Sequence, residues 1–190
     1  MRKVLFLNPP SFKGFDGGAG ARYQARREVR SFWFPTWLAH PAAMVPGSRL
    51  VDAPPADLGL DDILPLATEF EVAVLHTSTP SFFSDARTAE ALKEVNPKLE
   101  IGLVGSHTDV LPGESLEKAK SVDWVTRGEF DHTVVELAEG RPFEEIDGLS
   151  WRHHGEVVHN KPRPVPEDLD ALPHVVDVYA RDLVLENYQV

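Results

Sequence analysis

Residues 99–108 read LEIGLVGSHT and residues 122–129 read VDWVTRGE, and these two stretches decide the fold. Each begins with a short, mostly apolar run, which predicts a buried strand. Each run then gives way to glycine and small polar or charged residues, and a segment of helical character follows. A strand that leads through a glycine-containing turn into a helix is the repeating unit of a parallel α/β sheet.

The same unit recurs toward the N-terminus. Strands are predicted at residues 4–7, 49–53, 72–75, 99–104 and 122–126. Helices are predicted at residues 36–45, 60–70, 85–95, 114–120 and 132–139. Strands that alternate with helices in this way favour right-handed parallel crossovers. The sequence therefore predicts an α/β fold whose core is a doubly wound, five-stranded, mainly parallel sheet of the Rossmann or flavodoxin-like kind.

The last part of the chain has a different pattern. Residues 148–152 and 156–159 predict a small β-hairpin that turns at His154 and Gly155. Residues 161–166, KPRPVP, predict a stiff extended connector, and an apolar tail follows it. We therefore predict a Rossmann-like domain over residues 1–145, and a hairpin and linker over residues 146–190 that lead toward a further domain.

Composition narrows the classes of function. The 190 residues carry a formal net charge of −11, so no general positive field favours nucleic acid as a partner. The absence of cysteine excludes disulfides, a thiolate zinc site and an iron–sulfur cluster held by this chain. No apolar run approaches the roughly 20 residues of a membrane-spanning helix, and residues 1–10 do not form a signal peptide. We expect a cytoplasmic protein without a transmembrane segment.

Small polar residues gather where the predicted strands end. The carboxyl ends of parallel strands lie at one edge of a sheet, and ligands of this fold bind there. The predicted ligand-binding residues at that edge are Asn8, Ser78, Thr79, Gly105, Ser106, His107, Thr108, Gly128 and Glu129. Residues 11–35 follow the first strand without helical or strand periodicity, which predicts a functional loop.

Motifs for other chemistries are missing. The chain contains no G-x-x-x-x-G-K-[ST], no G-x-G-x-x-G after the first strand and no G-x-S-x-G. Eight histidines are present, but His153 and His154 are neighbours that would point to opposite faces of a strand. We predict neither a metal site nor a catalytic residue in this chain.

Taken together, residues 104–108, 122–129 and 135–137 resemble the cobalamin-binding domain of B12-class radical SAM enzymes. The matching pattern is a Gly-x-His-x-Thr-like turn, a V-D-x-V-x-x-G-E strand and a helix that ends near E-L. The Asn8-Pro9-Pro10 ending of the first strand fits as well. The resemblance implies that cobalamin binds over the strand ends, with its tail between the sheet and a helix.

The first fifty-five residues resemble more narrowly the J-type radical SAM proteins associated with hopanoid biosynthesis. The likeness is carried by residues 6–12, 17–28 and 34–39. It implies a bacterial enzyme that acts on the glycosylated side chain of a hopanoid lipid, contracting an aminosugar ring to a cyclitol ether. The [4Fe–4S] cluster and S-adenosylmethionine would then belong to a downstream radical SAM barrel, so this chain alone is expected to be inactive.

The sequence departs from these families at two points. It lacks the D-x-H-x-x-G motif whose histidine ligates cobalt in methionine-synthase-type modules, since Asp131 and His132 are adjacent. It also lacks the C-x-x-x-C-x-x-C loop of a radical SAM domain. Two alternatives stay open: a domain that keeps the fold but binds no cobalamin and acts as a substrate lid or packing module, and a flavodoxin-like or response-regulator module. The latter would need an acidic pocket after the first strand, where the chain has Asn8.

Overall fold

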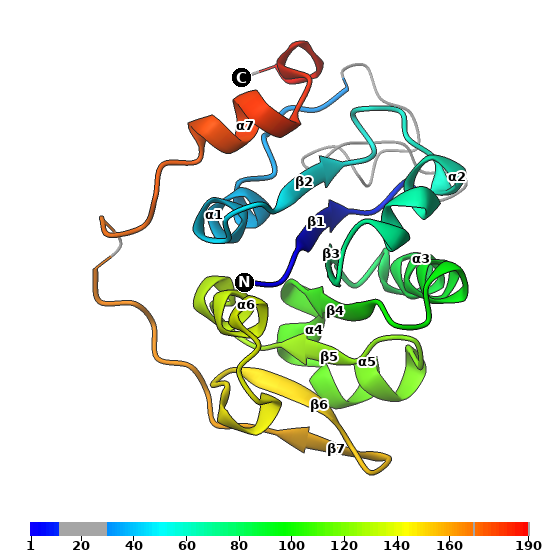
Figure 1. Ribbon diagram of the computed structural model, residues 1–190, viewed down its shortest axis with the longest axis vertical. Coiled ribbons are helices and arrows are strands. Elements are labelled where there is room, and N and C mark those ends of the chain that lie inside the picture. The colour runs from blue at the N-terminus through cyan, green and yellow to red at the C-terminus, as the bar shows by residue number, and fades with distance from the viewer. Residues whose placement is uncertain (12–29, 169, 190) are drawn as a thin grey trace.

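The computed structural model describes residues 1–11, 30–168 and 170–189. These residues form three layers, with α1 and α6 on one side of a sheet and α2, α3 and α5 on the other (Figure 1). Residues 12–29, most of the predicted functional loop, lie outside the described part. Within the described part, no helix is both long and apolar enough to cross a membrane.

The sheet has seven strands in the order β2-β1-β3-β4-β5-β6-β7. The strands are β1 (Val4–Asn8), β2 (Arg49–Asp52), β3 (Val72–His76), β4 (Glu100–Val104), β5 (Trp124–Thr126), β6 (Leu149–His153) and β7 (Glu156–His159). The first five are parallel, and β6 and β7 are antiparallel to their neighbours. The doubly wound, mainly parallel α/β fold predicted from the sequence is confirmed, and the order 2-1-3-4-5 is the flavodoxin-like one.

The alternation of side chains along β1 explains why the sheet is covered on both faces. Leu5 and Leu7 pack into one core and Val4 and Phe6 into the other, and all four are fully buried. A parallel strand with helices on both faces reads as a continuous apolar run because both sets of side chains are buried.

Helices fill the connections from β1 through to β6. They are α1 (Thr36–Met44), α2 (Leu60–Ile63), the 3₁₀ helix η1 (Leu64–Thr68), α3 (Phe82–Val95), α4 (Ser106–Val110), α5 (Pro112–Lys118) and α6 (Asp131–Glu139), followed by the 3₁₀ helix η2 (Phe143–Glu145). The single helix predicted over residues 60–70 is thus divided, with Pro65 at the start of the 3₁₀ part. The helix predicted from residue 114 is preceded by α4, which begins directly after Gly105.

Gly102 and Trp124 fit together between β4 and β5. Trp124 is completely buried, and a Cβ atom on Gly102 would overlap its ring. The indole Nε1 of Trp124 donates to Glu100 at 2.9 Å, and Arg2 pairs with the same carboxylate at 2.8 Å. Glu100 and Trp124 begin β4 and β5, so this cluster lies at the amino edge of the sheet, opposite the carboxyl edge where the site is predicted.

The hairpin predicted near residue 154 is present and extends the sheet. His154 and Gly155 both have positive φ angles, 49° and 90°, as a two-residue hairpin turn with the twist of its strands requires. The antiparallel pairing of β6 with β5 joins the hairpin to the parallel strands. Arg152 on β6 fixes it further by donating to the carbonyls of Leu116 and Ala119 at 2.7 and 2.8 Å.

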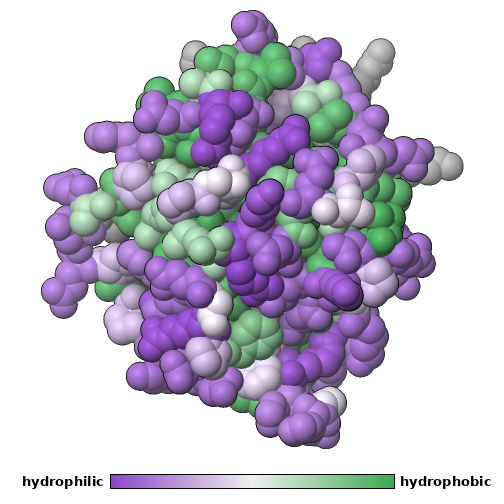
Figure 2. Space-filling view, in the orientation of Figure 1, coloured by the Kyte–Doolittle hydropathy of each residue, from purple (hydrophilic) through white to green (hydrophobic). Residues whose placement is uncertain are grey.

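The C-terminal segment was expected to be an extended tail, but it folds back onto the domain. It runs along the α1 and α6 side from β7 to the opposite end of the sheet, where α7 (Val176–Asp182) and the 3₁₀ helix η3 (Leu185–Asn187) lie beside α1 and β2 (Figure 1). Phe34 stacks between Tyr179 and Tyr188, with ring centroids 4.4 and 4.5 Å away. Exposed hydrophobic side chains gather on this end of the molecule (Figure 2), among them Val184 and Leu185.

Candidate functional site at the carboxyl edge of the sheet

The carboxyl ends of β1, β3, β4 and β5 lie at one edge of the sheet, as their parallel pairing requires. The strand order reverses between β1 and β3, because the chain goes from β1 outward to β2 and returns to β3 on the other side. In open α/β sheets the ligand crevice lies outside the carboxyl ends at such a switch point.

The loops after β3 and β4 interlock at this edge. The Nδ1 atom of His107 lies 3.2 Å from the Thr79 hydroxyl, so the two segments share a hydrogen bond. Gly105 has φ +120°, and a Cβ atom there would overlap the carbonyl oxygen of Thr77 and lie 3.0 Å from the His76 ring. Because Gly105 has no side chain, two backbone segments of the chain itself can approach each other closely here.

Beneath Thr79, a buried polar cluster holds the start of α3. The Asp85 carboxylate accepts hydrogen bonds from Thr77 at 2.8 Å and from Ser81 at 2.7 Å. The hydroxyl of Ser78 lies 2.8 Å from that of Ser81. Ser78 is buried while Thr79 is exposed, so of these two predicted ligand residues only Thr79 faces the surface.

The loops after β4 and β5 also meet. The Asp109 carboxylate accepts a hydrogen bond from the backbone N–H of Gly128 at 2.7 Å. Ser106 is exposed at the start of α4, whereas Thr108 is buried and donates to the Gly105 carbonyl at 3.0 Å. Glu129 is exposed and turns toward the α1 and α6 side of the sheet.

Asn8, the last residue of β1, is hydrogen-bonded to the neighbouring strand β2. Its amide donates to Asp52 at 2.6 Å, and the hydroxyl of Tyr188 donates to the other oxygen of the same carboxylate at 2.8 Å. Burial and the Asp52 charge raise the pKa of Tyr188, which keeps this hydroxyl protonated as a donor. The structure thus joins the loops after β3, β4 and β5, and it ties Asn8 to β2 and the C-terminal segment.

Two residues of α1 that were not predicted from the sequence border this edge. The ring of Trp37 lies 5.2 Å from that of His76, at the end of β3. The Nε1 atom of Trp37 and the Nδ1 atom of His40 are buried without a hydrogen-bond partner in the described part of the chain. Trp37 and His40 are three residues apart on the helix after the first strand, so they lie on one face of that helix. This spacing could have identified them from the sequence.

Two further polar atoms are buried without a partner among the described residues, the Nε2 of His107 and the Nε of Arg127. His107 is 6% exposed, and its ring lies 4.3 Å from that of Phe82. Burial lowers the pKa of His107, so the imidazole is neutral at pH 7 and one of its nitrogens is an acceptor.

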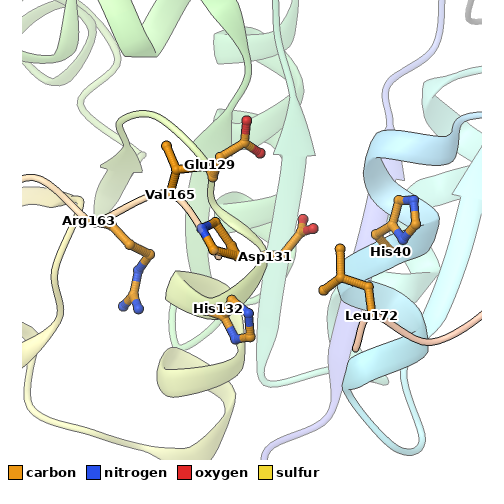
Figure 3. A pocket seen from close by; sticks show the side chains of 8 residues that line it. His40, Glu129, Asp131, His132, Arg163, Val165 and Leu172 are labelled. Carbon is orange, nitrogen blue, oxygen red and sulfur yellow. The ribbon is translucent and has the colours of Figure 1, made fainter. Parts of the chain in front are cut away.

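A cavity of about 410 Å³ opens between α1 and α6, beside Glu129 (Figure 3). It is lined by His40, Glu129, Asp131, His132, Arg163, Val165, Pro166 and Leu172. Burial, with the nearby charge of Glu129, raises the pKa of Asp131 to about 6. Among the residues that the structure describes, no group of three or more His, Asp or Glu side chains is arranged to hold a metal ion.

Two curated relatives match most of the chain. It is 28% identical over 180 residues to an uncharacterized methyltransferase, PH0819, of Pyrococcus horikoshii, covering 90% of this chain and 37% of that protein. It is 27% identical over 185 residues to the anaerobic magnesium-protoporphyrin IX monomethyl ester cyclase of Rubrivivax gelatinosus, covering 90% of this chain and 31% of that protein. The chain thus spans about a third of the length of these relatives.

No protein-family model matches the chain. Among solved structures it resembles TsrM from Kitasatospora setae, a radical S-adenosylmethionine methyltransferase with cobalamin and a [4Fe–4S] cluster bound. The TM-score is 0.61 at 13% sequence identity, and the match covers 90% of this chain and 31% of TsrM. The likeness shows that nine tenths of this chain share a fold with one part of that enzyme.

Proposed function

We propose that this chain is a corrinoid-binding domain of a radical SAM enzyme, with cobalamin over the carboxyl edge of the sheet. The fold supports this location, because the strand order reverses there between β1 and β3. The likeness to a structure that contains cobalamin supports the choice of ligand. The relatives named as a methyltransferase and a cyclase support an enzymatic parent.

The observation that carries the proposal is the gathering around this edge of buried polar atoms that have no hydrogen-bond partner among the residues that the structure describes. They are Trp37 Nε1 and His40 Nδ1 on the helix after β1, His107 Nε2 after β4 and Arg127 Nε after β5. Leaving one such atom without a partner costs about 1–3 kcal/mol, and each case calls for an explanation. A polar ligand that spans the strand ends and reaches between the layers would supply the missing partners.

The space available suggests how cobalamin is divided between two regions. The exposed residues Thr79, Ser106 and Gly128 leave the rim of the edge open to a flat macrocycle. The cavity between α1 and α6 is at the lower end of the roughly 300–1,000 Å³ of small-molecule sites, so it suits the nucleotide tail and not the corrin. This arrangement would put the tail between α1, α6 and the C-terminal segment that covers them.

The remaining parts of the reaction are assigned to the parent enzyme. A chain without cysteine cannot hold the [4Fe–4S] cluster, so the cluster and S-adenosylmethionine belong to a barrel outside this chain. For the substrate we propose the glycosylated side chain of a hopanoid lipid and its ring contraction to a cyclitol ether. That finer assignment rests on the sequence resemblance of the first fifty-five residues.

One structural observation favours the alternative function, a fold-retaining domain that binds no cobalamin. Asn8 and Ser78, two of the predicted ligand residues, are buried in hydrogen bonds with Asp52 and Ser81 of the same chain. Such residues would serve packing, and the edge would then cover a substrate or a neighbouring domain.

Equilibrium dialysis with hydroxocobalamin tests the proposal. The Ser106→Trp variant adds a bulky ring at an exposed position of the rim, so the fold should persist while access is blocked. We expect its dissociation constant to rise at least about tenfold over the wild type. Glu139→Trp adds the same ring at an exposed position near the end of α6 and should bind normally. Circular dichroism spectra of both variants should match the wild type.

Absence of binding by the wild-type chain at high micromolar cobalamin would overturn the proposal in favour of the fold-retaining alternative. Equal loss of affinity in Ser106→Trp and Glu139→Trp would overturn the location over the strand ends.

A further inference from the structure

A hollow of about 220 Å³ lies between α3 and the end of α5, on the side of the sheet away from α1 and α6 (Figure 1). Three positively charged side chains and one negatively charged side chain line it, in a chain whose formal net charge is −11. A gathering of basic side chains against the overall charge marks a place on the surface that attracts anions. The residues that matter for its chemistry are Phe83, Arg87, Glu90, Lys118, Lys120 and Ser121.

Two of the three basic side chains have no acidic partner. Elsewhere in the chain, Arg2 is paired with Glu100 and Lys93 with Asp123. Within the part of the chain that the structure describes, no carboxylate lies at ion-pair distance from the charged nitrogens of Arg87 or Lys120. Both side chains therefore have hydrogen-bond donors available to a ligand in the hollow that they share.

The third basic side chain, Lys118, is held beside an exposed aromatic ring. Its ammonium lies 5.6 Å from the centroid of the Phe83 ring, and it also pairs with Glu114 one turn earlier on α5. An exposed ion pair between residues four apart on a helix contributes little to stability, so Lys118 can exchange Glu114 for an anion at low cost. Lys118 thus adds a positive charge whose position is already restricted.

The size of the hollow and its donors favour a phosphate group among anions. The hollow is smaller than the roughly 300–1,000 Å³ of sites that enclose a whole small molecule, so it suits a single charged group. The guanidinium of Arg87 is a planar fork of donors that matches phosphate oxygens, and Lys120 supplies a point charge beside it. A phosphate monoester carries about 1.5–2 negative charges at pH 7, which three cations can balance even beside Glu90.

We propose that this hollow is a binding site for a phosphate group, which Arg87, Lys118 and Lys120 hold. The hydroxyl of Ser121 borders the same space and supplies a neutral donor. The inference does not rest on the proposed function, because the predicted cobalamin-binding residues are not among those that line the hollow. The phosphate belongs to a soluble compound or to the headgroup of a lipid, since both present the same chemistry.

Inorganic phosphate is the first probe of this site. It is titrated into the chain at a constant ionic strength set with sodium chloride, and NMR follows the side-chain Nε of Arg87 and the backbone amides of residues 118–121. We expect saturable shifts with a Kd on the order of 1 mM. The Kd should rise with ionic strength, because the three cations are exposed and salt screens them.

Charge removal tests which residues hold the phosphate. Arg87→Gln and Lys120→Gln should each raise the Kd at least about fivefold, because each removes an unpaired charge from the hollow. Arg49→Gln and Lys98→Gln remove the same charges from exposed positions outside the hollow, so they should change the Kd by less than about twofold. All four residues are exposed, and circular dichroism should show an unchanged fold.

A substitution of the opposite sign separates binding from damage to the fold. Glu90→Gln removes the negative charge from the lining and should lower the Kd about two- to fivefold. Glu139→Gln, at an exposed position of α6, changes the net charge equally and should leave the Kd nearly unchanged. A gain of affinity in Glu90→Gln cannot result from partial unfolding.

Sedimentation with lipid vesicles distinguishes the two sources of phosphate. Binding to phosphatidylglycerol vesicles and not to phosphatidylcholine vesicles, lost in Arg87→Gln and kept in Arg49→Gln, would identify a lipid headgroup. Saturable binding of phosphate without binding to either vesicle would identify a soluble phosphate compound.

Two results would overturn the inference. One is a wild-type chain that shows neither saturable shifts with phosphate nor binding to phosphatidylglycerol vesicles. The other is an equal loss of affinity in Arg87→Gln and Arg49→Gln, which would show a response to net charge and no site between α3 and α5. Both results leave the proposed cobalamin binding intact, because that is measured with a different ligand at the carboxyl edge.

Discussion

Gly105 and Gly128 both have positive φ angles at the carboxyl edge, but their surroundings differ. At Gly105 the backbone has φ +120° and ψ 180°, a region that only glycine populates readily, and a Cβ atom would overlap the Thr77 carbonyl. At Gly128 φ is +66°, and nothing lies within 4 Å of an added Cβ atom. Substitutions at the two glycines therefore distinguish the cost of backbone strain alone from the cost of strain together with steric overlap.

We expect Gly105→Ala to lower the free energy of unfolding by about 2–4 kcal/mol, since strain and overpacking each cost roughly 1–3 kcal/mol. Gly128→Ala should cost about 1–2 kcal/mol, the penalty of the left-handed conformation alone. Urea denaturation of both variants measures the difference. Equal losses would show that the contact with Thr77 contributes nothing.

The role of Gly105 also marks a limit of prediction from sequence. The turn after the fourth strand was located correctly, and its glycine was predicted only as one of the ligand-binding residues. The structure adds a second constraint on this glycine, because the carbonyl of Thr77 lies where a Cβ atom would be. Thr77 belongs to another strand, and which strands become neighbours depends on the packing of the whole sheet. A close contact between two such loops is not encoded in the local pattern of either one.

At the scale of elements, local signals predicted the hairpin but not its attachment. The turn at His154 and Gly155 follows from residues that tolerate positive φ angles. The antiparallel pairing of β6 with β5 depends on contacts such as those of Arg152 with carbonyls at the end of α5, which join distant parts of the chain. The return of the C-terminal segment likewise depends on distant partners, Asp52 and Phe34.

The hydroxyl of Tyr188 anchors that segment, and its removal tests the anchor. Tyr188 is 8% exposed and donates to the Asp52 carboxylate at 2.8 Å. Tyr188→Phe keeps the ring stack on Phe34 but loses a hydrogen bond to a charged group, at a cost of about 1.5–3 kcal/mol. Hydrogen exchange of α7 and η3 should become faster, because their docking weakens.

Tyr179→Phe is the matched control for this anchor. Its hydroxyl bonds that of Thr36 at 2.7 Å, a neutral pair that is partly exposed, so its loss should cost only about 0.5–1.5 kcal/mol. If Tyr179→Phe destabilises the docking of α7 and η3 as much as Tyr188→Phe does, the Asp52 bond is not the anchor.

At the scale of the whole molecule, the sequence predicted the class of fold, and with it the meeting of the carboxyl strand ends at one edge, from five strand–helix units. Parallel strands bring their carboxyl ends together whatever their order, so the edge could be inferred without knowing which strands pair. The cavity between α1 and α6 could not be inferred from the sequence, because it is covered by residues after the hairpin, more than twenty positions beyond α6. Asp131 was accordingly noted only as a neighbour of His132.

The raised pKa of Asp131 makes the stability of the whole domain depend on pH. The folded-state pKa is about 6 against 3.8 for an unperturbed aspartate, so between these values the folded state binds more protons than the unfolded one. The stability that the fold gains from protonated Asp131 is therefore fully present below about pH 4 and is lost as the pH rises through about 6. Above that, its ionisation costs the fold about 1–2 kcal/mol after allowance for solvent screening.

Asp131→Asn removes this titration, so we expect the variant to gain about 1–2 kcal/mol of stability relative to the wild type between about pH 4 and about pH 7. Urea denaturation across that range measures the difference, with Glu139→Gln as an exposed control on the same helix that should show no such trend. A difference that stays constant with pH would mean that Asp131 titrates alike in the folded and unfolded states. A rising difference would show that the fold keeps an ionisable group at a cost in stability, as expected of a residue retained to bind a ligand.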